Sequence, residues 1–266
     1  MQHIAVNGCK LWVEDTGDIA KPAILFSHSL FFDHTMFHHQ RDELAGDYRI
    51  VAYDHRGQGR SSPAERAEQS MDHLTEDAAG LISALNLAPC HVIGNSMGGF
   101  IALRLAARYP DLIASVVPIN SSGEEEHKKK DFAPLVESMA ANGTEPLIDT
   151  LMYIMFGDTF LADPDRVKEK NHWRQKMLNL PKSIADSAHQ VVFRQSILHE
   201  LKDCRVPVFA IAGDEDHAYG AKEAKNIATA SGGKYHVVDK TGHSASIEKY
   251  KVINELIINH IKNTNK

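Results

Sequence analysis

Residues 91–100 have the sequence HVIGNSMGGF, an apolar run that leads through G-x-S-x-G into an amphipathic stretch ending near Arg108. A strand that turns sharply into a helix around a central serine exposes the hydroxyl at the carboxyl end of a sheet. Glycines two residues to either side are needed because strand and helix pass too close for a Cβ. The helix N-terminus also favours negative charge at the serine. Ser96 is therefore a candidate nucleophile, the alternative being a glycine-rich turn with an incidental serine.

Short apolar runs and helix-like stretches alternate on both sides of this segment. The expected strands are His3–Val6, Lys10–Glu14, Ala23–Ser27, Arg49–Tyr53, His91–Gly94, Leu112–Ile119, Val206–Ala212 and Lys234–Val238. The expected helices are Asp33–Leu44, Met71–Leu87, Gly98–Arg108, Gly220–Ala230 and Ser246–Ile261. The first two strands flank an Asn-Gly turn, which predicts a hairpin. The alternation predicts an α/β fold with a mostly parallel central sheet flanked by helices.

The pattern changes between Ser121 and Leu201, where no buried strand is expected. Segments such as Leu147–Phe156 are helical in character and rich in Met, Leu, Ile and Phe. A stretch this long that carries its own apolar residues is an insertion and not a linker. We therefore expect a core of residues 1–121 and 200–266, interrupted by a helical insertion over residues 122–199.

Composition narrows the classes of partner. The 266 residues include 29 basic and 35 acidic side chains, a net charge of −6, which gives no bulk attraction for nucleic acid or anionic membranes. Cys9, Cys90 and Cys204 form no CxxC pair, so we expect free thiols in a reducing compartment. The N-terminus lacks the pattern of a secretory signal, and no apolar run is long enough to span a bilayer. These features predict a cytoplasmic protein, a monomer or homodimer, acting on a small molecule.

The G-x-S-x-G turn at residues 94–98 is called the elbow below. With this elbow and the segment YDHRGQGRSS (53–62), the chain resembles the α/β-hydrolase superfamily over nearly its full length. The resemblance implies a catalytic order of serine, acid and histidine. It implies His243 as the base, because this histidine follows a glycine in the loop before the final helix. It implies Asp216 as the acid, in the loop after strand 206–212, with Asp214 and Glu215 as rivals. The acid would hold the imidazole tautomer and stabilise the imidazolium.

The same resemblance implies two backbone N–H donors for an oxyanion. One is Met97, directly after the serine, and the other is Leu30, in the loop after strand 23–27. Most relatives have His-Gly where this chain has His28-Ser29, a departure similar to that of 3-oxoadipate enol-lactonase-like members. The departure does not damage the hole, because a backbone amide serves regardless of its side chain. His28 is expected to be structural.

Two other patterns could be mistaken for ligand sites. The segment 53–62 lacks a third glycine and a Lys-Ser/Thr pair, so it does not match a phosphate loop, and Asp54 and Arg56 are expected to brace it. His34 and His38 have the spacing of zinc ligands on a helix, but no third ligand is evident. We therefore expect a packed or solvated helix face there, and neither a metal nor a cofactor.

In the superfamily that the chain resembles, such an insertion forms a cap over the serine. Some of its apolar side chains would then line an acyl or ring pocket, whereas most would pack the cap onto the core. The leading hypothesis is a carboxylic ester hydrolase that cleaves a small ester or lactone through an acyl-serine intermediate. Serine at the elbow, in place of aspartate, argues against haloalkane dehalogenase or epoxide hydrolase chemistry.

Three alternatives stay open. The string GNSMGG is similar to the elbow of C–C bond hydrolases acting on ring-cleavage diketones, but the glycine-rich oxyanion loop of that group is missing at Leu30–Asp33. Cofactor-free perhydrolase activity is a second alternative. The third is a ligand-binding signalling protein that keeps the triad but turns over poorly, which measured turnover would distinguish.

Overall fold

A computed structural model describes residues 1–264 of the protein. Its central sheet has eight strands in the order β1-β2-β4-β3-β5-β6-β7-β8. The strands β1 to β2 and β2 to β4 pair antiparallel, and every other neighbouring pair is parallel. The bounds are β1 Gln2–Val6, β2 Cys9–Asp15, β3 Ala23–Ser27, β4 Arg49–Tyr53, β5 Cys90–Asn95, β6 Ile113–Ile119, β7 Phe209–Gly213 and β8 Lys234–Val238. The predicted fold class is confirmed.

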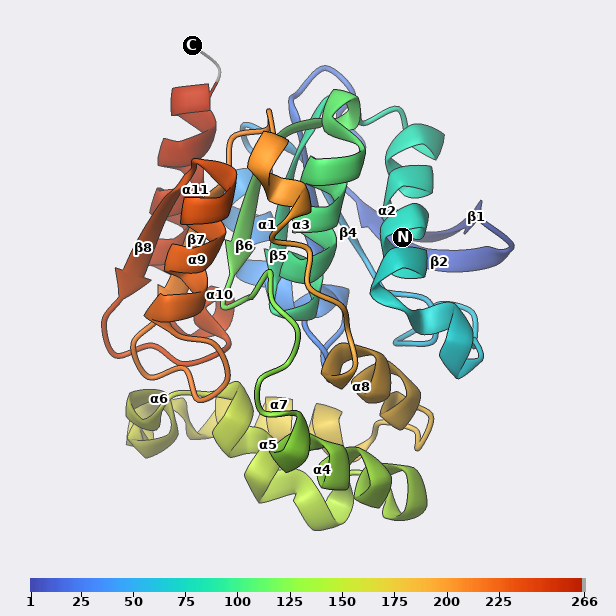
Figure 1. Cartoon of the computed structure of the whole chain (residues 1–266), viewed down its shortest axis with the longest axis vertical. Coiled ribbons are helices and arrows are strands. Elements are labelled where there is room, and N and C mark those ends of the chain that lie inside the picture. The colour runs from blue at the N-terminus through green and yellow to red at the C-terminus, as the bar shows by residue number, and fades with distance from the viewer. Residues whose placement is uncertain (265–266) are drawn as a thin grey trace.

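Helices flank this sheet (Figure 1). Those of the core are α1 His38–Leu44, α2 Met71–Ala84, α3 Met97–Arg108, α9 Ala221–Ser231, α10 Ala245–Glu248 and α11 Tyr250–Thr264. Short 3-10 helices are η1 His34–Phe37, η2 Arg66–Gln69, η3 Pro110–Leu112, η4 Glu145–Leu147, η5 Pro164–Arg166 and η6 Glu200–Asp203. None of the helices within residues 1–264 is long and apolar enough to cross a membrane.

Between β6 and β7 the chain forms helices only, over the stretch that we call the inserted segment (residues 122–199). Its α helices are α4 Lys129–Asn142, α5 Ile148–Met155, α6 Asp158–Ala162, α7 Val167–Leu178 and α8 Ile184–Val192. They gather at one end of the molecule, beyond the end of β6 (Figure 1). The carboxyl ends of the parallel strands therefore face the inserted segment.

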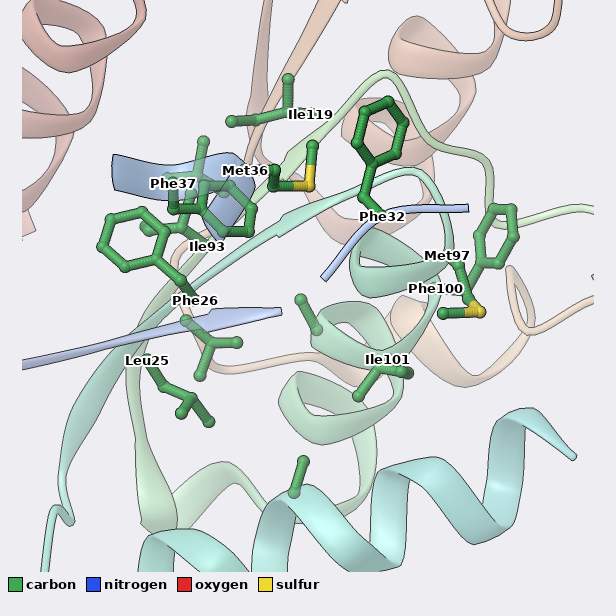
Figure 2. Close-up of a cluster of buried hydrophobic side chains, with 14 of the residues drawn as sticks. Leu25, Phe26, Phe32, Met36, Phe37, Ile93, Met97, Phe100, Ile101 and Ile119 are labelled. Carbon is green, nitrogen blue, oxygen red and sulfur yellow. The ribbon is translucent and has the colours of Figure 1, made fainter. Parts of the chain in front are cut away.

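The central strands are apolar on both faces because both faces are covered. Every residue of β3, β4 and β5 is buried, as expected for the middle of a parallel sheet. Figure 2 shows side chains of β3 and β5 packed with others from η1 and α3. Fully buried examples are Leu25, Phe26, Ile93, Phe100 and Ile101. Burying a side chain of this size contributes roughly 1.5–3 kcal/mol to the stability of the fold, so the strand and helix on either side of Ser96 are well anchored in the core.

Two predicted helices are each divided in the structure. The stretch predicted as Asp33–Leu44 is η1 followed by α1, and Asp33 caps it by accepting from the N–H of Thr35 at 2.9 Å. The predicted final helix is broken at Lys249, whose φ of −130° and ψ of 41° are not helical. The break separates α10, directly after the His243 loop, from α11.

Element ends also differ from the prediction by one to three residues, and two of these differences have a clear cause. Strand β7 begins at Phe209 instead of Val206, because Pro207 has no N–H to give to a ladder and Val208 makes only an isolated bridge. Helix α2 ends at Ala84 instead of Leu87, since Asn86 adopts a positive φ of 51°. Neither difference moves a candidate site residue.

Candidate active site

Ser96 occupies the sharp turn between β5 and α3. Its φ of 52° and ψ of −111° lie in a sparsely populated region, which the surrounding structure has to enforce. A Cβ added at Gly94 would come within 2.1 Å of the Gly98 carbonyl oxygen, and one added at Gly98 within 1.9 Å of the Ser27 carbonyl oxygen. The two glycines are therefore required by the close approach of strand, helix and neighbouring strand.

Asp216 and His243 come from the loops after β7 and β8. The Nδ1 atom of His243 lies 3.0 Å from both carboxylate oxygens of Asp216. The carboxylate also accepts from the side-chain amide of Asn120 at 2.9 Å and from the N–H groups of Ala218 and Tyr219 at 2.7 and 3.0 Å. Both side chains are almost fully buried. These donors fix the carboxylate in place and leave the Nε2 atom of His243 free to face a reactant.

The two rivals for the acid role have other partners. Asp214 accepts from the N–H of Thr241 at 3.2 Å. Glu215 accepts from the N–H and hydroxyl of Thr159, at 2.7 and 2.6 Å. Within residues 1–264 neither carboxylate hydrogen-bonds to His243, and of the three acidic residues only Asp216 does.

Ser96 and His243 line the same cavity, which has a volume of about 70 Å³ and lies under the inserted segment. No hydrogen bond joins their side chains within the described chain, and such bonds are often long before substrate binds. The remaining walls are Leu30, Phe31, Phe132, Leu135, Val136, Met139, Leu151, Ile154, Met155, Ala188, Val191, Val192, Ala218 and Tyr219. The cavity is thus apolar except around the reactive groups.

Both residues expected to donate to an oxyanion lie near Ser96. Met97 is the first residue of α3, and Leu30 borders the cavity from the loop after β3. In the part of the chain that the structure describes, the N–H groups of both residues lack a hydrogen-bond acceptor. Phe31 adopts a positive φ of 72°, which turns the loop beside the cavity. Within residues 1–264 both N–H groups are therefore unpaired, as an oxyanion donor has to be.

Comparison with known proteins identifies the family. A family model described as the alpha/beta hydrolase fold matches residues 22–250. The chain belongs to the α/β hydrolase family.

Among relatives of this α/β hydrolase is 3-oxoadipate enol-lactonase 1 of Acinetobacter baylyi, 30% identical over 210 residues, which are 79% of this chain and 77% of the relative. RutD of Agrobacterium fabrum, described as a candidate carbamate hydrolase, is 30% identical over 55% of this chain and 56% of its own. An enol-lactonase structure from Burkholderia xenovorans matches with a TM-score of 0.91, at 24% identity, over 98% of this chain and all of the other. The last likeness concerns the fold.

His28 supports the loop that carries Leu30 in this α/β hydrolase. Its Nδ1 atom donates to the carbonyl of Ser29 at 2.8 Å, and its Nε2 atom accepts from the N–H of His55 at 3.0 Å. Burial lowers the pKa of His28, so the ring stays neutral with this tautomer. The role is structural, as expected from the sequence.

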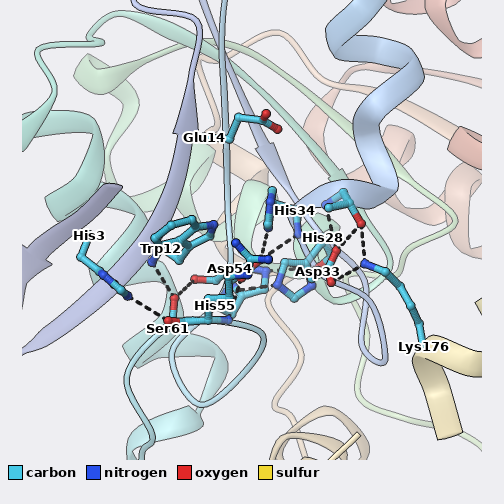
Figure 3. Close-up of polar contacts among 12 residues, drawn as sticks. His3, Trp12, Glu14, His28, Asp33, His34, Asp54, His55, Ser61 and Lys176 are labelled. Carbon is cyan, nitrogen blue, oxygen red and sulfur yellow. Dashed lines mark hydrogen bonds and ion pairs between the residues drawn. The ribbon is translucent and has the colours of Figure 1, made fainter. Parts of the chain in front are cut away.

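Asp33, His34 and Asp54 form the one group of potential metal ligands found in residues 1–264, and their ligand atoms lie within 4.8 Å of one another (Figure 3). The Nδ1 atom of His34 lies 2.7 Å from Asp54, and the Nζ atom of Lys176 lies 2.5 Å from Asp33. His34 and Asp54 are therefore already bonded to each other, and Asp33 is paired with the Lys176 ammonium. His38 contacts the carbonyl of Thr35 and does not join the group.

A buried polar network beside the cavity was not predicted. The Tyr219 ring lies 5.6 Å from the His243 ring, and its hydroxyl donates to Glu126 at 2.6 Å. Arg194 donates to that hydroxyl and to Glu126, both at 3.1 Å. Burial opposes ionisation of Glu126, yet the Tyr219 hydroxyl and the Arg194 guanidinium hold its pKa below the usual value. The network ties both ends of the inserted segment to the Asp216 loop.

Proposed function

We propose that this hydrolase cleaves small carboxylic esters or lactones through an acyl-serine intermediate, with Ser96, His243 and Asp216 as its triad. The observation that carries the proposal is the meeting of Ser96, at a strained elbow, with an Asp216-bound imidazole in one cavity. We further propose that residues 122–199 act as a cap, because the cavity lies between them and the elbow.

The proposed reaction forms an acyl-serine and then hydrolyses it. The Nε2 atom of His243 takes the proton of Ser96 as its oxygen attacks the carbonyl carbon, and the N–H groups of Leu30 and Met97 stabilise the oxyanion. The imidazolium returns the proton to the leaving alkoxide. A water molecule then attacks the acyl-serine with His243 as base, which releases the acid and restores Ser96. Asp216 keeps the imidazole in the required tautomer and stabilises its charged form.

The cavity walls favour a short, uncharged acyl group or lactone ring. The volume of about 70 Å³ is far below the several hundred Å³ usual for larger ligands. Within the described residues, none of the cavity-lining side chains is a lysine or arginine. Burying a carboxylate without such a partner is costly. An oxoadipate lactone keeps one free carboxylate, so we expect it to be a poorer substrate here than a neutral ester or lactone.

The test measures turnover of short p-nitrophenyl esters, with enol-lactones, carbamates and diketones in the same screen. Ser96→Ala should lower kcat by at least about 10³-fold, as loss of a triad member does. Ser83→Ala, in α2 and away from the cavity, is the matched control. Multiple turnover that survives Ser96→Ala would refute the nucleophile assignment. Stoichiometric acylation of Ser96 without release would instead indicate a binding protein.

A further inference from the structure

Glu248 is a buried carboxylate whose partners flank His243. It ends α10, five residues after His243, and is only 5% exposed. One oxygen accepts from the N–H of Gly242 at 2.9 Å, and the other accepts from the N–H of Ser244 at 3.1 Å. These are the residues immediately before and after the histidine. The carboxylate therefore holds the backbone on both sides of His243.

The carbonyl of His243 has a hydrogen-bond partner other than Glu248. It accepts from the side-chain amide of Asn95 at 3.0 Å, and Asn95 immediately precedes the nucleophile. The hydroxyl of Ser246 donates to the other end of the same amide at 3.1 Å. The backbone that carries His243 is thus connected to the elbow through Asn95 and to the start of α10 through Glu248.

Glu248 also contacts the inserted segment. The oxygen bonded to Gly242 accepts from the N–H of Gly157, in the turn between α5 and α6, at 3.2 Å. A Cβ at Gly157 would lie 2.7 Å from the Gly242 nitrogen, and one at Gly242 would lie 1.9 Å from the Gly157 nitrogen. The two backbones therefore pack in direct contact, and the Glu248 carboxylate joins their N–H groups.

We propose that Glu248 is a positioning residue, which fixes the His243 backbone relative to Ser96 and couples it to the inserted segment through Gly157. The inference rests on the proposed role of His243 as base. A side chain misplaced by about 1 Å can cost about 10²-fold in rate, so loss of this anchor should lower kcat more than it changes substrate binding.

The charges near Glu248 add a pH signature. Burial, reinforced by the negative charge of Asp216, raises the pKa of Glu248 to about 7, although its three N–H donors oppose the shift. The other charged groups facing this region are His243, Glu215 of the Asp216 loop, and Arg166, which donates to the Glu248 and Ile247 carbonyls. Protonated Glu248 has an O–H where an acceptor is needed. Its protonation, as the pH falls through about 7, should therefore disturb the backbone that carries His243.

The experiment compares Glu248→Gln with wild type. The concentration of active enzyme in each preparation is measured by titration with a fluorophosphonate that labels Ser96. We expect kcat per titrated site to fall about 10- to 100-fold with KM changed by less than about 2-fold. As the pH falls through about 7, the acid limb of log kcat/KM should be steeper for wild type than for Glu248→Gln, which lacks the titrating carboxyl group. Glu255→Gln, on the exposed face of α11, is the matched control and should change neither quantity.

If glutamine prevents folding, Glu248→Asp keeps the charge but shortens the reach. It should lower kcat by about 10-fold and keep the steep acid limb. Unchanged kcat per site and an unchanged limb in Glu248→Gln would overturn the inference, as would a loss of titratable enzyme in both variants. Parallel Ser96→Ala separates the two proposals. An inactive Ser96→Ala with an unaffected Glu248→Gln refutes only the positioning role.

Discussion

The elbow at Ser96 and the loops that carry Asp216 and His243 are held in place in different ways. The elbow is held by close backbone packing: β5 turns directly into α3, Gly94 approaches the Gly98 carbonyl, and Gly98 approaches the Ser27 carbonyl of β3. The loops are held by side chains from outside them: Asn120 and Asn95, distant in the sequence, bond to Asp216 and to the His243 carbonyl, and Glu248 of the adjacent α10 bonds to Gly242. The position of Ser96 therefore depends on backbone packing, whereas that of His243 depends on hydrogen bonds made by side chains.

This difference predicts that a conservative substitution of a side chain that holds a loop leaves the protein folded but lowers its activity. Asp216→Asn replaces the carboxylate that holds Nδ1 and keeps its shape. We expect kcat to fall about 10³- to 10⁴-fold, because the wrong imidazole tautomer is favoured and the imidazolium loses its partner. Steady-state kinetics with a short ester measures the loss, and thermal unfolding checks the fold. Asp214→Asn is the control. A larger loss in Asp214→Asn than in Asp216→Asn would reverse the assignment of the acid.

At the elbow, by contrast, a small substitution should lower the stability of the fold. Gly98→Ala places a methyl group 1.9 Å from the Ser27 carbonyl oxygen. This clash can be relieved only if β3 or α3 moves. We expect the free energy of unfolding to fall by about 3 kcal/mol or more, since this is overpacking against a rigid backbone. Urea unfolding measures it. Gly46→Ala, which meets nothing within 4 Å, should cost less than about 1 kcal/mol. Equal stability of the two variants would contradict the close-packing argument.

The same contrast explains what could be predicted from the sequence. The elbow, the hairpin and strands such as Ala23–Ser27 are encoded locally by apolar runs, turn residues and glycines, and the structure has them where they were expected. The places of Asp216 and His243 in their loops followed from the resemblance, and the structure brings the two together.

The supporting residues could not be predicted in this way. Glu126 belongs to the charged run EEEHKKKD and has the local character of a solvated residue, yet it is 4% exposed and paired with Arg194. Glu248 looks like one more charged residue of a terminal helix. The burial of each depends on partners 68 and 91 residues away, Arg194 and Gly157. The break at Lys249 likewise has no glycine or proline to mark it.

Besides the Glu248–Gly157 contact, an ion pair connects the core to the inserted segment, and its loss should have the smallest effect of the changes considered. Lys176 of α7 contacts Asp33 at 2.5 Å and the hydroxyl of Thr35 at 2.6 Å (Figure 3). Both charged side chains are about one quarter exposed, unlike the buried Glu248. Although burial opposes it, the Lys176 ammonium holds the pKa of Asp33 at about 2, below the model-compound value of 3.8. A lowered carboxyl pKa stabilises the fold above 3.8, and this contribution is lost as pH falls through about 2.

Lys176→Met should therefore lower the free energy of unfolding by no more than about 1 kcal/mol at pH 7, because a partly exposed ion pair is screened by water. The difference from wild type should shrink as the pH falls from 4 toward 2, where Asp33 becomes protonated in both proteins. Urea unfolding across this range measures it, with Lys168→Met on the exposed face of α7 as control. We expect kcat to be unchanged, since Lys176 holds the inserted segment at a point that contacts neither triad loop. A loss of kcat as large as that in Glu248→Gln would mean that any anchor of the inserted segment supports the base, and not the Gly157 contact in particular.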